Sequence, residues 1–307
     1  METVSYGGWE KCGRLSNGMI ELLVTQEVGP RIIRLGFVGE ENLFKEIPGD
    51  LGKTGGENWR LYGGHRLWHA PEAIPRTYFP DNVSVAVAGE NNILVVTQGT
   101  ETTTGIQKKM VLEMSGTENR VKVTQELYNQ NFWEVECAAW ALSVMKPGGM
   151  AIIPQESFVA HTELLTPVRP LALWGYTDMS DDRWRWGKRY VTLKQRPEKT
   201  SPTKVGFGNT QEWVAYSVNR YLFVVLFHYQ DGSTYPDFGS STELFTNSEL
   251  LEVETLSPLK KITPGQALQH VENWFLFPNV PVEDTDESID CLVLPLVEKA
   301  MASVKNR

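Results

Sequence analysis

The sequence predicts an all-β protein, a large antiparallel β-sandwich with a short C-terminal helix. Three observations predict this class: short stretches rich in Val, Ile and Thr, turn formers between these stretches, and no sign of crossover helices. About a dozen antiparallel strands are too many for one open sheet, which would leave an apolar face in water. We therefore expect two sheets packed face to face, with residues 1–307 forming one domain.

The expected strands are short and partly alternating in polarity. They cover residues 19–25, 30–38, 82–88, 92–98, 106–115, 120–128, 136–145, 212–218, 221–229, 249–256 and 269–277. Turn formers such as SNG, GENN, SGTEN and KPGG separate them at intervals typical of hairpins. Residues 286–305 have the only helical pattern, with acidic residues suited to an N-terminal cap. Pro295 is expected to kink or divide this helix.

Net charge, cysteine content and the N-terminal residues limit the possible binding partners, metal sites and cellular location. The formal net charge is -9 without a basic run, which argues against nucleic acid and anionic membrane surfaces. Cys12, Cys137 and Cys291 are odd in number and far apart, so they suggest neither a disulfide framework nor a cysteine metal site. The N-terminal residues do not read as a secretory signal, and no apolar run reaches the ~20 residues that cross a bilayer. A cytoplasmic protein is expected.

Ten tryptophans favour a carbohydrate as the ligand. Several stand beside charged or polar residues, as in ENWRLYGGHRLWHAPE and DDRWRWGKRY. An indole face stacks on the C–H face of a sugar ring, while carboxylates, amides and guanidinium groups bind its hydroxyls. The alternative is that most of these rings simply fill a large core. As a set, they favour a binding site on the concave outer face of one sheet.

The segment YGGHRLWHAPE, residues 62–72, concentrates groups that carry protons and form hydrogen bonds. Gly63–Gly64 and Pro71 disfavour a helix, so we expect extended or loop structure. An extended chain places His65, Leu67 and His69 on one face and Arg66 and Trp68 on the other. Zinc binding through the histidines and Glu72, a purely structural role, and a hydrogen-bonding site for a polyol all remain open.

The strand LLEVETL carries two glutamates on one face. Glu252 and Glu254 are two residues apart, about 6–7 Å at strand rise. Like charges on a partly buried face raise at least one pKa, which suits a general acid or base near neutral pH. Asp237, Glu243 and Asn247 add polar groups nearby in sequence. The alternative is an exposed face on which the glutamates are only solvated.

These residues carry a resemblance to a known superfamily. The run LEVETLSPLKKITPGQALQHVENWFLF (251–277) resembles the C-terminal region of galactose mutarotase-like proteins, which include aldose 1-epimerases and hexose-6-phosphate epimerases. YGGHRLWHAPE and VGPRIIRLGF (28–37) also resemble segments of that superfamily, and the runs YFPDN, WALSVMKPGG and YPDFG resemble one branch of it. The resemblance covers nearly the whole chain. It implies a galactose mutarotase-like sandwich and places Glu254 at the position of the catalytic base.

One departure from that pattern concerns the general acid. The resemblance implies a histidine on a middle strand, where this chain has Trp140, and an indole N–H cannot shuttle a proton at neutral pH. His65, His69 or His161 would then have to supply the acid.

The expected function is therefore the interconversion of sugar anomers in the manner of an aldose 1-epimerase, without a cofactor because only protons move. Glu254, His65 and His69 are the expected catalytic residues. The expected sugar-binding residues are Arg66, Trp68, Glu72, Trp140, His161, Asp237 and Glu243.

Two other functions stay open: a non-catalytic sugar-binding module and a carbohydrate-cleaving lyase or glycosidase. Arg66, Arg76, Arg183 and Lys204 could hold an anionic group of the sugar, or they could be ordinary surface and ion-pair residues.

Overall fold

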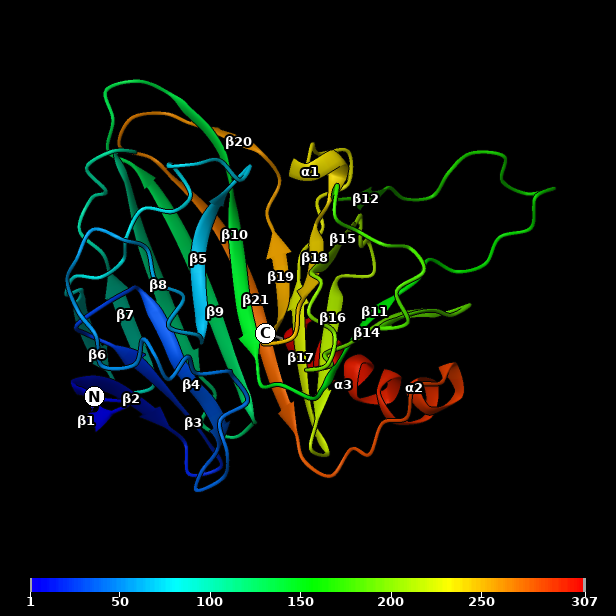
Figure 1. Ribbon diagram of the computed structural model, residues 1–307, viewed down its shortest axis with the longest axis horizontal. Coiled ribbons are helices and arrows are strands. Elements are labelled where there is room, and N and C mark those ends of the chain that lie inside the picture. Colours follow the sequence, from blue (N-terminus) through cyan, green and yellow to red (C-terminus); the bar gives the residue numbers. More distant parts are fainter. Residues whose placement is uncertain (1, 306–307) are drawn as a thin grey trace.

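Two antiparallel sheets form the body of the protein, and two short helices follow them (Figure 1). The structure is a computed structural model that describes residues 2–305. Within this range one sheet has eleven strands and the other has ten. The predicted all-β sandwich is confirmed.

The first sheet holds the strands that build the candidate site. Its central strands are β5 and β10, which pair with each other. In spatial order it contains β1 (Glu2–Tyr6), β2 (Trp9–Ser16), β3 (Ile20–Thr25), β4 (Arg31–Phe37), β5 (His65–Ala70), β10 (Val135–Met145), β19 (Leu251–Leu256), β18 (Thr242–Thr246), β15 (Thr203–Phe207) and β12 (Leu171–Leu173), with β20 (Lys260–Ile262) paired to β10.

The second sheet lies behind the first in Figure 1. In spatial order it contains β13 (Trp184–Trp186), β14 (Tyr190–Lys194), β11 (Met150–Pro154), β16 (Trp213–Val218), β17 (Tyr221–Phe227), β21 (Ala267–Phe277), β9 (Arg120–Asn129), β8 (Ile106–Met114), β7 (Ile93–Thr97) and β6 (Ala86–Glu90). The expected strand at 82–88 starts only at Ala86. Asn82 is instead a buried loop residue whose side chain bonds to Tyr62 and to the carbonyl oxygens of Gly56 and Asn58.

The two outer faces of the sandwich are covered differently. The main hydrophobic core lies between the sheets and includes Trp274 and Phe223 of the second sheet. The outer face of the second sheet packs against the C-terminal helices through residues such as Val297 and Ala300. The outer face of the first sheet instead carries a small aromatic cluster around Trp68 and Trp140. The C-terminal helices therefore cover part of the outer face of the second sheet, whereas the first sheet carries aromatic side chains on its outer face.

The predicted C-terminal helix is present in two pieces. α2 (Asp286–Leu292) and α3 (Leu294–Lys305) are separated at Val293, next to Pro295, so the predicted division is confirmed. The N-terminal cap of α2 is Thr285, which accepts a hydrogen bond from Ser288, and the acidic residues lie in the first turn instead. A further short helix, α1 (Pro236–Gly239), precedes β18. No helix within residues 2–305 is long and apolar enough to cross a membrane.

Candidate functional site

Strand β5 presents two different sets of side chains to its two faces. Arg66 and Trp68 lie on the outer face, where the guanidinium carbon of Arg66 is 4.4 Å from the ring centre of Trp68. His65 lies on the inner face, with its ring 4.7 Å from that of Trp274 in the second sheet. The alternation expected for this segment is confirmed.

Cross-strand register explains why distant residues meet on the outer face, because directly opposed residues in an antiparallel pair point to the same side. Three neighbouring rows run across the first sheet. They are Trp68, Trp140 and Leu256; then Arg66, Leu142, Glu254 and Glu243; then Val144, Glu252, Phe245 and Lys204.

A pocket of about 290 Å³ lies over these rows, and we call it the outer pocket. It is lined by Trp59, Leu61, Arg66, Trp68, Glu72, Tyr78, Trp140, Leu142, Tyr176, Lys204, Phe245, Asn247, Leu250 and Glu252. Of the residues expected at the site, it therefore gathers Arg66, Trp68, Glu72 and Trp140.

Aromatic rings form one wall of the outer pocket. The ring of Trp68 lies 5.0 Å from Tyr78 and 5.4 Å from both Trp59 and Trp140, measured between ring centres. The Arg66 guanidinium lies against both Trp68 and Trp59, so the cationic group is held flat on apolar surface. The wall therefore combines closely packed apolar faces with N–H donors.

A buried cluster of charges lies beneath the pocket. The Lys204 ammonium is 2.6 Å from Glu243 and 3.0 Å from Glu254, and it lies between the rings of Trp140 and Trp174. The indole N–H of Trp140 donates to Glu254 at 2.7 Å. Glu243 and Glu254 are fully buried, so Lys204 and Trp140 separate both carboxyl groups from the pocket.

Burial dominates the acid–base behaviour of this cluster. It raises the pKa of Glu243 well above the usual value, and Glu254 adds to the effect while Lys204 opposes it. Burial also raises the pKa of Glu254, against the attraction of Lys204. One ammonium group balances one carboxylate, so this coupled pair of carboxyl groups favours holding one proton between them.

Donors without acceptors border the same pocket. Arg66 donates through Nη2 to Glu252 at 3.0 Å, but its Nε and Nη1 are buried without a hydrogen-bond partner in the described part of the chain. The indole N–H of Trp59 is also buried without a hydrogen-bond partner among the described residues. A buried unsatisfied donor costs roughly 1–3 kcal/mol, so this pocket is suited to a ligand that supplies oxygen acceptors.

Neither His65 nor His69 lines the outer pocket or lies on the face of the sheet that carries Glu254, so their expected position beside Glu254 is wrong. His65 is bonded to Ser143 at 2.9 Å inside the sandwich. His69 lies 3.5 Å from Glu101, which pairs with Lys108 at 2.6 Å. Both histidines alternate with Arg66 and Trp68 along β5, so the sheet itself separates them from Glu254.

The remaining expected residues lie at or outside the rim. Glu72 lines the pocket and accepts a hydrogen bond from Tyr78. Asp237 lies on α1 and contributes negative charge near Glu243, although it does not line the pocket. His161 is exposed in the long connection between β11 and β12 and is not among the lining residues. Among residues 2–305, no group of three or more His, Cys, Asp or Glu side chains is placed to hold a metal ion.

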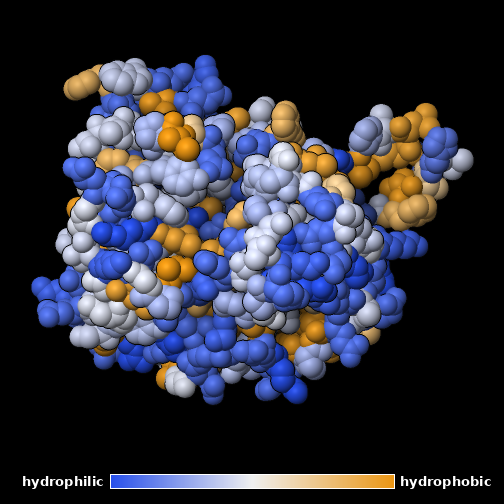
Figure 2. Space-filling model, in the orientation of Figure 1, coloured by the Kyte–Doolittle hydropathy of each residue, from blue (hydrophilic) through white to orange (hydrophobic). Residues whose placement is uncertain are grey.

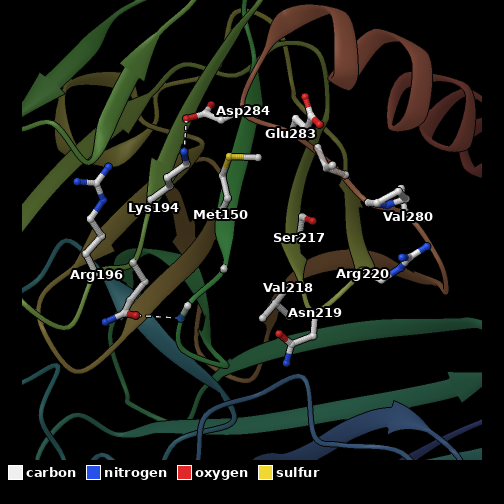
Figure 3. Close-up of a pocket in the computed structure, with 15 residues that line it drawn as sticks. Met150, Lys194, Arg196, Ser217, Val218, Asn219, Arg220, Val280, Glu283 and Asp284 are labelled. Atoms are coloured by element: carbon white, nitrogen blue, oxygen red, sulfur yellow. Dashed lines mark hydrogen bonds and ion pairs between the residues drawn. The ribbon is translucent and has the colours of Figure 1, made fainter.

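A larger pocket of about 610 Å³ lies elsewhere, beside β11, β14 and β16 (Figure 3). Three of its charged side chains form ion pairs: Lys194 pairs with Asp284 at 2.8 Å, and Arg196 pairs with Asp182 at 3.1 Å. None of the described residues that line it has a buried polar atom without a partner. The outer pocket, although smaller, is bordered by Arg66 and Trp59, which carry buried donors without a partner in the described part of the chain.

No protein-family model and no curated protein matches the chain. Solved structures do match over most of its length. The Slr1438 protein from Synechocystis sp. PCC 6803 has 10% identity, covers 91% of this chain and 100% of its own, and gives a TM-score of 0.58. A galactose mutarotase related enzyme from Lactobacillus acidophilus has 8% identity, with coverages of 87% and 98% and a TM-score of 0.56.

A galactose mutarotase-like protein from Clostridium acetobutylicum has 11% identity, covers 90% of this chain and 98% of its own, and gives a TM-score of 0.54. The chain has the galactose mutarotase-like fold. At these identities the likeness concerns the fold alone, and a fold does not determine the chemistry of the outer pocket.

Proposed function

We propose that the outer pocket binds a carbohydrate. The observation that carries this proposal is the aromatic wall of Trp59, Trp68, Tyr78 and Trp140 next to the unpartnered N–H groups of Arg66 and Trp59. A sugar ring offers an apolar C–H face for such a wall and hydroxyl oxygens for such donors. The volume of about 290 Å³ lies at the lower end of small-molecule sites, which favours a monosaccharide.

The charges of the pocket favour a neutral sugar. Arg66 is paired with Glu252, and Lys204 is paired with Glu243 and Glu254. Each cation is already balanced, and Glu72 adds a negative charge at the rim. A phosphosugar or a uronate would have to compete with these carboxylates for Arg66 or Lys204.

Calorimetric titration with neutral hexoses, pentoses, uronates and phosphosugars tests the binding proposal. We expect weak binding of a neutral sugar, weakened several-fold further by Trp59→Phe, which keeps an aromatic ring but removes the N–H donor. Trp133→Phe is the matched control, because Trp133 is exposed and does not line the pocket. Absence of binding across the whole panel would overturn the proposal.

A second candidate function, interconversion of sugar anomers, is favoured by the carboxyl pair beneath the pocket. We propose that ionised Glu254 takes the proton of the anomeric hydroxyl while protonated Glu243 gives its proton to the ring oxygen, so that the ring opens to the free carbonyl form. Reversal after rotation closes the other anomer, and no cofactor takes part. Lys204 must move aside for this reaction, because both carboxyl groups are fully buried without a ligand.

Exchange NMR on a freshly dissolved pure anomer, against buffer alone, separates the two functions. If the protein is an epimerase, Glu254→Gln should slow anomer exchange by about 10²–10⁴-fold while sugar affinity persists. Glu72→Gln is the control, since it changes a carboxylate at the rim. Binding without acceleration by the parent protein would identify a non-catalytic binding module. The cytoplasmic location stays a prediction that fractionation of the source cells tests.

A further inference from the structure

The connection between β11 and β12, residues 155–170, projects from the body of the sandwich, and we call it the arm. Figure 1 shows it extending well beyond the sheets, and Figure 2 shows hydrophobic side chains along it. Phe158 and Leu165 are each 79% exposed, and Val159, Leu164 and Val168 are also exposed. None of these side chains belongs to a hydrophobic cluster of the described residues.

The arm is anchored at its base. Arg169 donates to the carbonyl oxygen of Pro154 at 3.0 Å and to the side chain of Gln155, which ties the two limbs together. The Glu156 carboxylate accepts from Thr210 at 2.7 Å and from Gln211 at 2.9 Å. At the tip, the carbonyl oxygen of Ala160 accepts from the backbone N–H groups of residues 163 and 164. A solvated linker of this length would be polar and untethered, whereas this segment is apolar and fixed at its base.

The apolar surface continues from the arm onto both sheets. β12 is the terminal strand of the first sheet, where Leu171 and Leu173 are about half exposed. β13 is the terminal strand of the second sheet, and Trp186 on it is partly exposed. Of the eighteen exposed large hydrophobic residues in the described chain, ten lie between Phe158 and Trp186. At roughly 100 Å² each they present roughly 1,000 Å², more than the ~800 Å² per partner of a stable interface.

We infer that this surface joins two copies of the chain into a dimer, with the arm of each copy packed on the sheet edges of the other. The surface contains both a projecting apolar element and the apolar edges that can receive it, so it is complementary to itself about a two-fold axis. An antiparallel edge strand such as β12 can also pair with its own copy.

Charge supports a second copy as the occupant. Two chains of net charge -9 repel each other, so a contact between them requires a surface with little charge. Residues 157–168 contain a single charged side chain, Glu163. This inference does not depend on the proposed carbohydrate function.

Sedimentation velocity tests the inference. We expect the parent protein to sediment as a dimer of twice 34.7 kDa and the double variant Phe158→Ser/Leu165→Ser to sediment as a monomer with unchanged circular dichroism. The matched control is Ile74→Ser/Phe132→Ser, which removes two equally exposed apolar side chains far from the arm and should leave the dimer intact. A parent protein that stays monomeric at concentrations of about 100 μM would overturn the inference, as would a dimer that survives the arm substitutions.

Hydrogen exchange measured by mass spectrometry gives a second readout. In the parent protein, residues 157–168 should be protected at high protein concentration and lose protection on dilution. Exchange in residues 71–78, which contain exposed Ile74, should not depend on concentration. Equal, fast exchange of the arm at all concentrations would contradict the inference even if the serine variants failed to fold.

Discussion

The two faces of β5, β10 and β19 carry polar clusters of opposite character. On the inner face, Glu272 bonds to Thr255, Trp274 and Gln125, and Thr255 also bonds to His270. On the outer face, Lys204 joins Glu243 and Glu254 beneath a pocket with unsatisfied donors. Glu272 and Thr255 are buried between the sheets, with His270 beside a separate pocket of about 430 Å³, whereas the outer cluster lies beneath the outer pocket. Burial of titratable groups therefore does not identify a site by itself.

Burial disfavours the charged forms of the groups in the inner cluster. Burial raises the pKa of Glu272 to about 7 and lowers the pKa of His65 to about 3 and that of His270 to about 4. The outer cluster contains a compensated ammonium group instead. Among residues 2–305, those bonded to Glu272 include no lysine or arginine, whereas the outer cluster is built around Lys204, so substitutions should affect the two clusters differently.

The largest expected effect comes from removing the cation of the outer cluster. Lys204→Met leaves the buried Glu243–Glu254 pair without its counter-charge and should destabilise the fold by about 3–5 kcal/mol at pH 7. Lys194→Met is the control, since its ion pair with Asp284 is partly exposed and is worth under about 1 kcal/mol. Urea unfolding measures both. Without Lys204 the two carboxyl pKa values rise further, so the lost stability should be recovered as the pH falls.

For the inner cluster we predict how the stability of the fold depends on pH. Between pH 4.5 and 6.5, His65 and His270 are protonated in the unfolded chain but not in the folded chain. Glu272 shows the opposite behaviour, because it is protonated in the folded chain but not in the unfolded chain. The net difference is one proton, so this cluster makes stability rise with pH by about 1.4 kcal/mol per unit.

Glu272→Gln removes the proton that only the folded chain binds. The free energy of unfolding should then rise with pH by a further ~1.4 kcal/mol per pH unit. Urea unfolding at pH 5 and pH 6 measures it, and all other groups contribute equally to both proteins. Identical slopes would mean that Glu272 is ionised in the folded protein.

A smaller effect is expected on sugar binding. Trp68→Ala removes the ring that contacts Trp59, Tyr78 and Trp140, and the lost stacking should weaken sugar binding roughly tenfold. Trp133→Ala should leave the affinity unchanged. Calorimetry with the sugar identified in the panel measures both variants, and equal affinities would place the ligand outside the outer pocket.

The smallest effect is expected at the inner face of the same strand. His69→Gln changes a side chain one residue from Trp68, but it faces Glu101 inside the sandwich. Sugar affinity and any acceleration of anomer exchange should stay within twofold of the parent protein. A large loss of either, with stability preserved, would mean that ligand chemistry reaches the inner face.

The sequence allowed the fold to be predicted because hydrophobic alternation and turn residues are local signals. Alternation also separated His65 from Arg66 correctly. Which of these two faces adjoins the pocket could not be derived, because that depends on the pairing of β5 with β10 and of β10 with β19. The histidines were expected at the site because imidazole is the usual proton carrier. This chemical argument does not say on which face of β5 their side chains lie.

Lys204 is a site residue whose role could not be predicted from the sequence. In sequence it is a single lysine in the run TKVGF, with nothing to distinguish it from a surface residue. Its position follows from the register of β15 with β18 and of β18 with β19, which places it opposite Phe245 and one row from Glu243. Residues 203–207 were not among the expected strands, so only the register and the burial of Lys204 reveal its role.

The hydrogen bond from Trp140 to Glu254 has a spectroscopic consequence. Its indole N–H meets a carboxylate, and its ring faces the Lys204 ammonium at 4.6 Å. Indole absorption and emission respond to nearby charge, so any event that protonates Glu254 or displaces Lys204 should shift the spectrum of Trp140. The protein thus contains its own optical probe beneath the outer pocket, readable by difference spectroscopy against Trp140→Phe without an added dye.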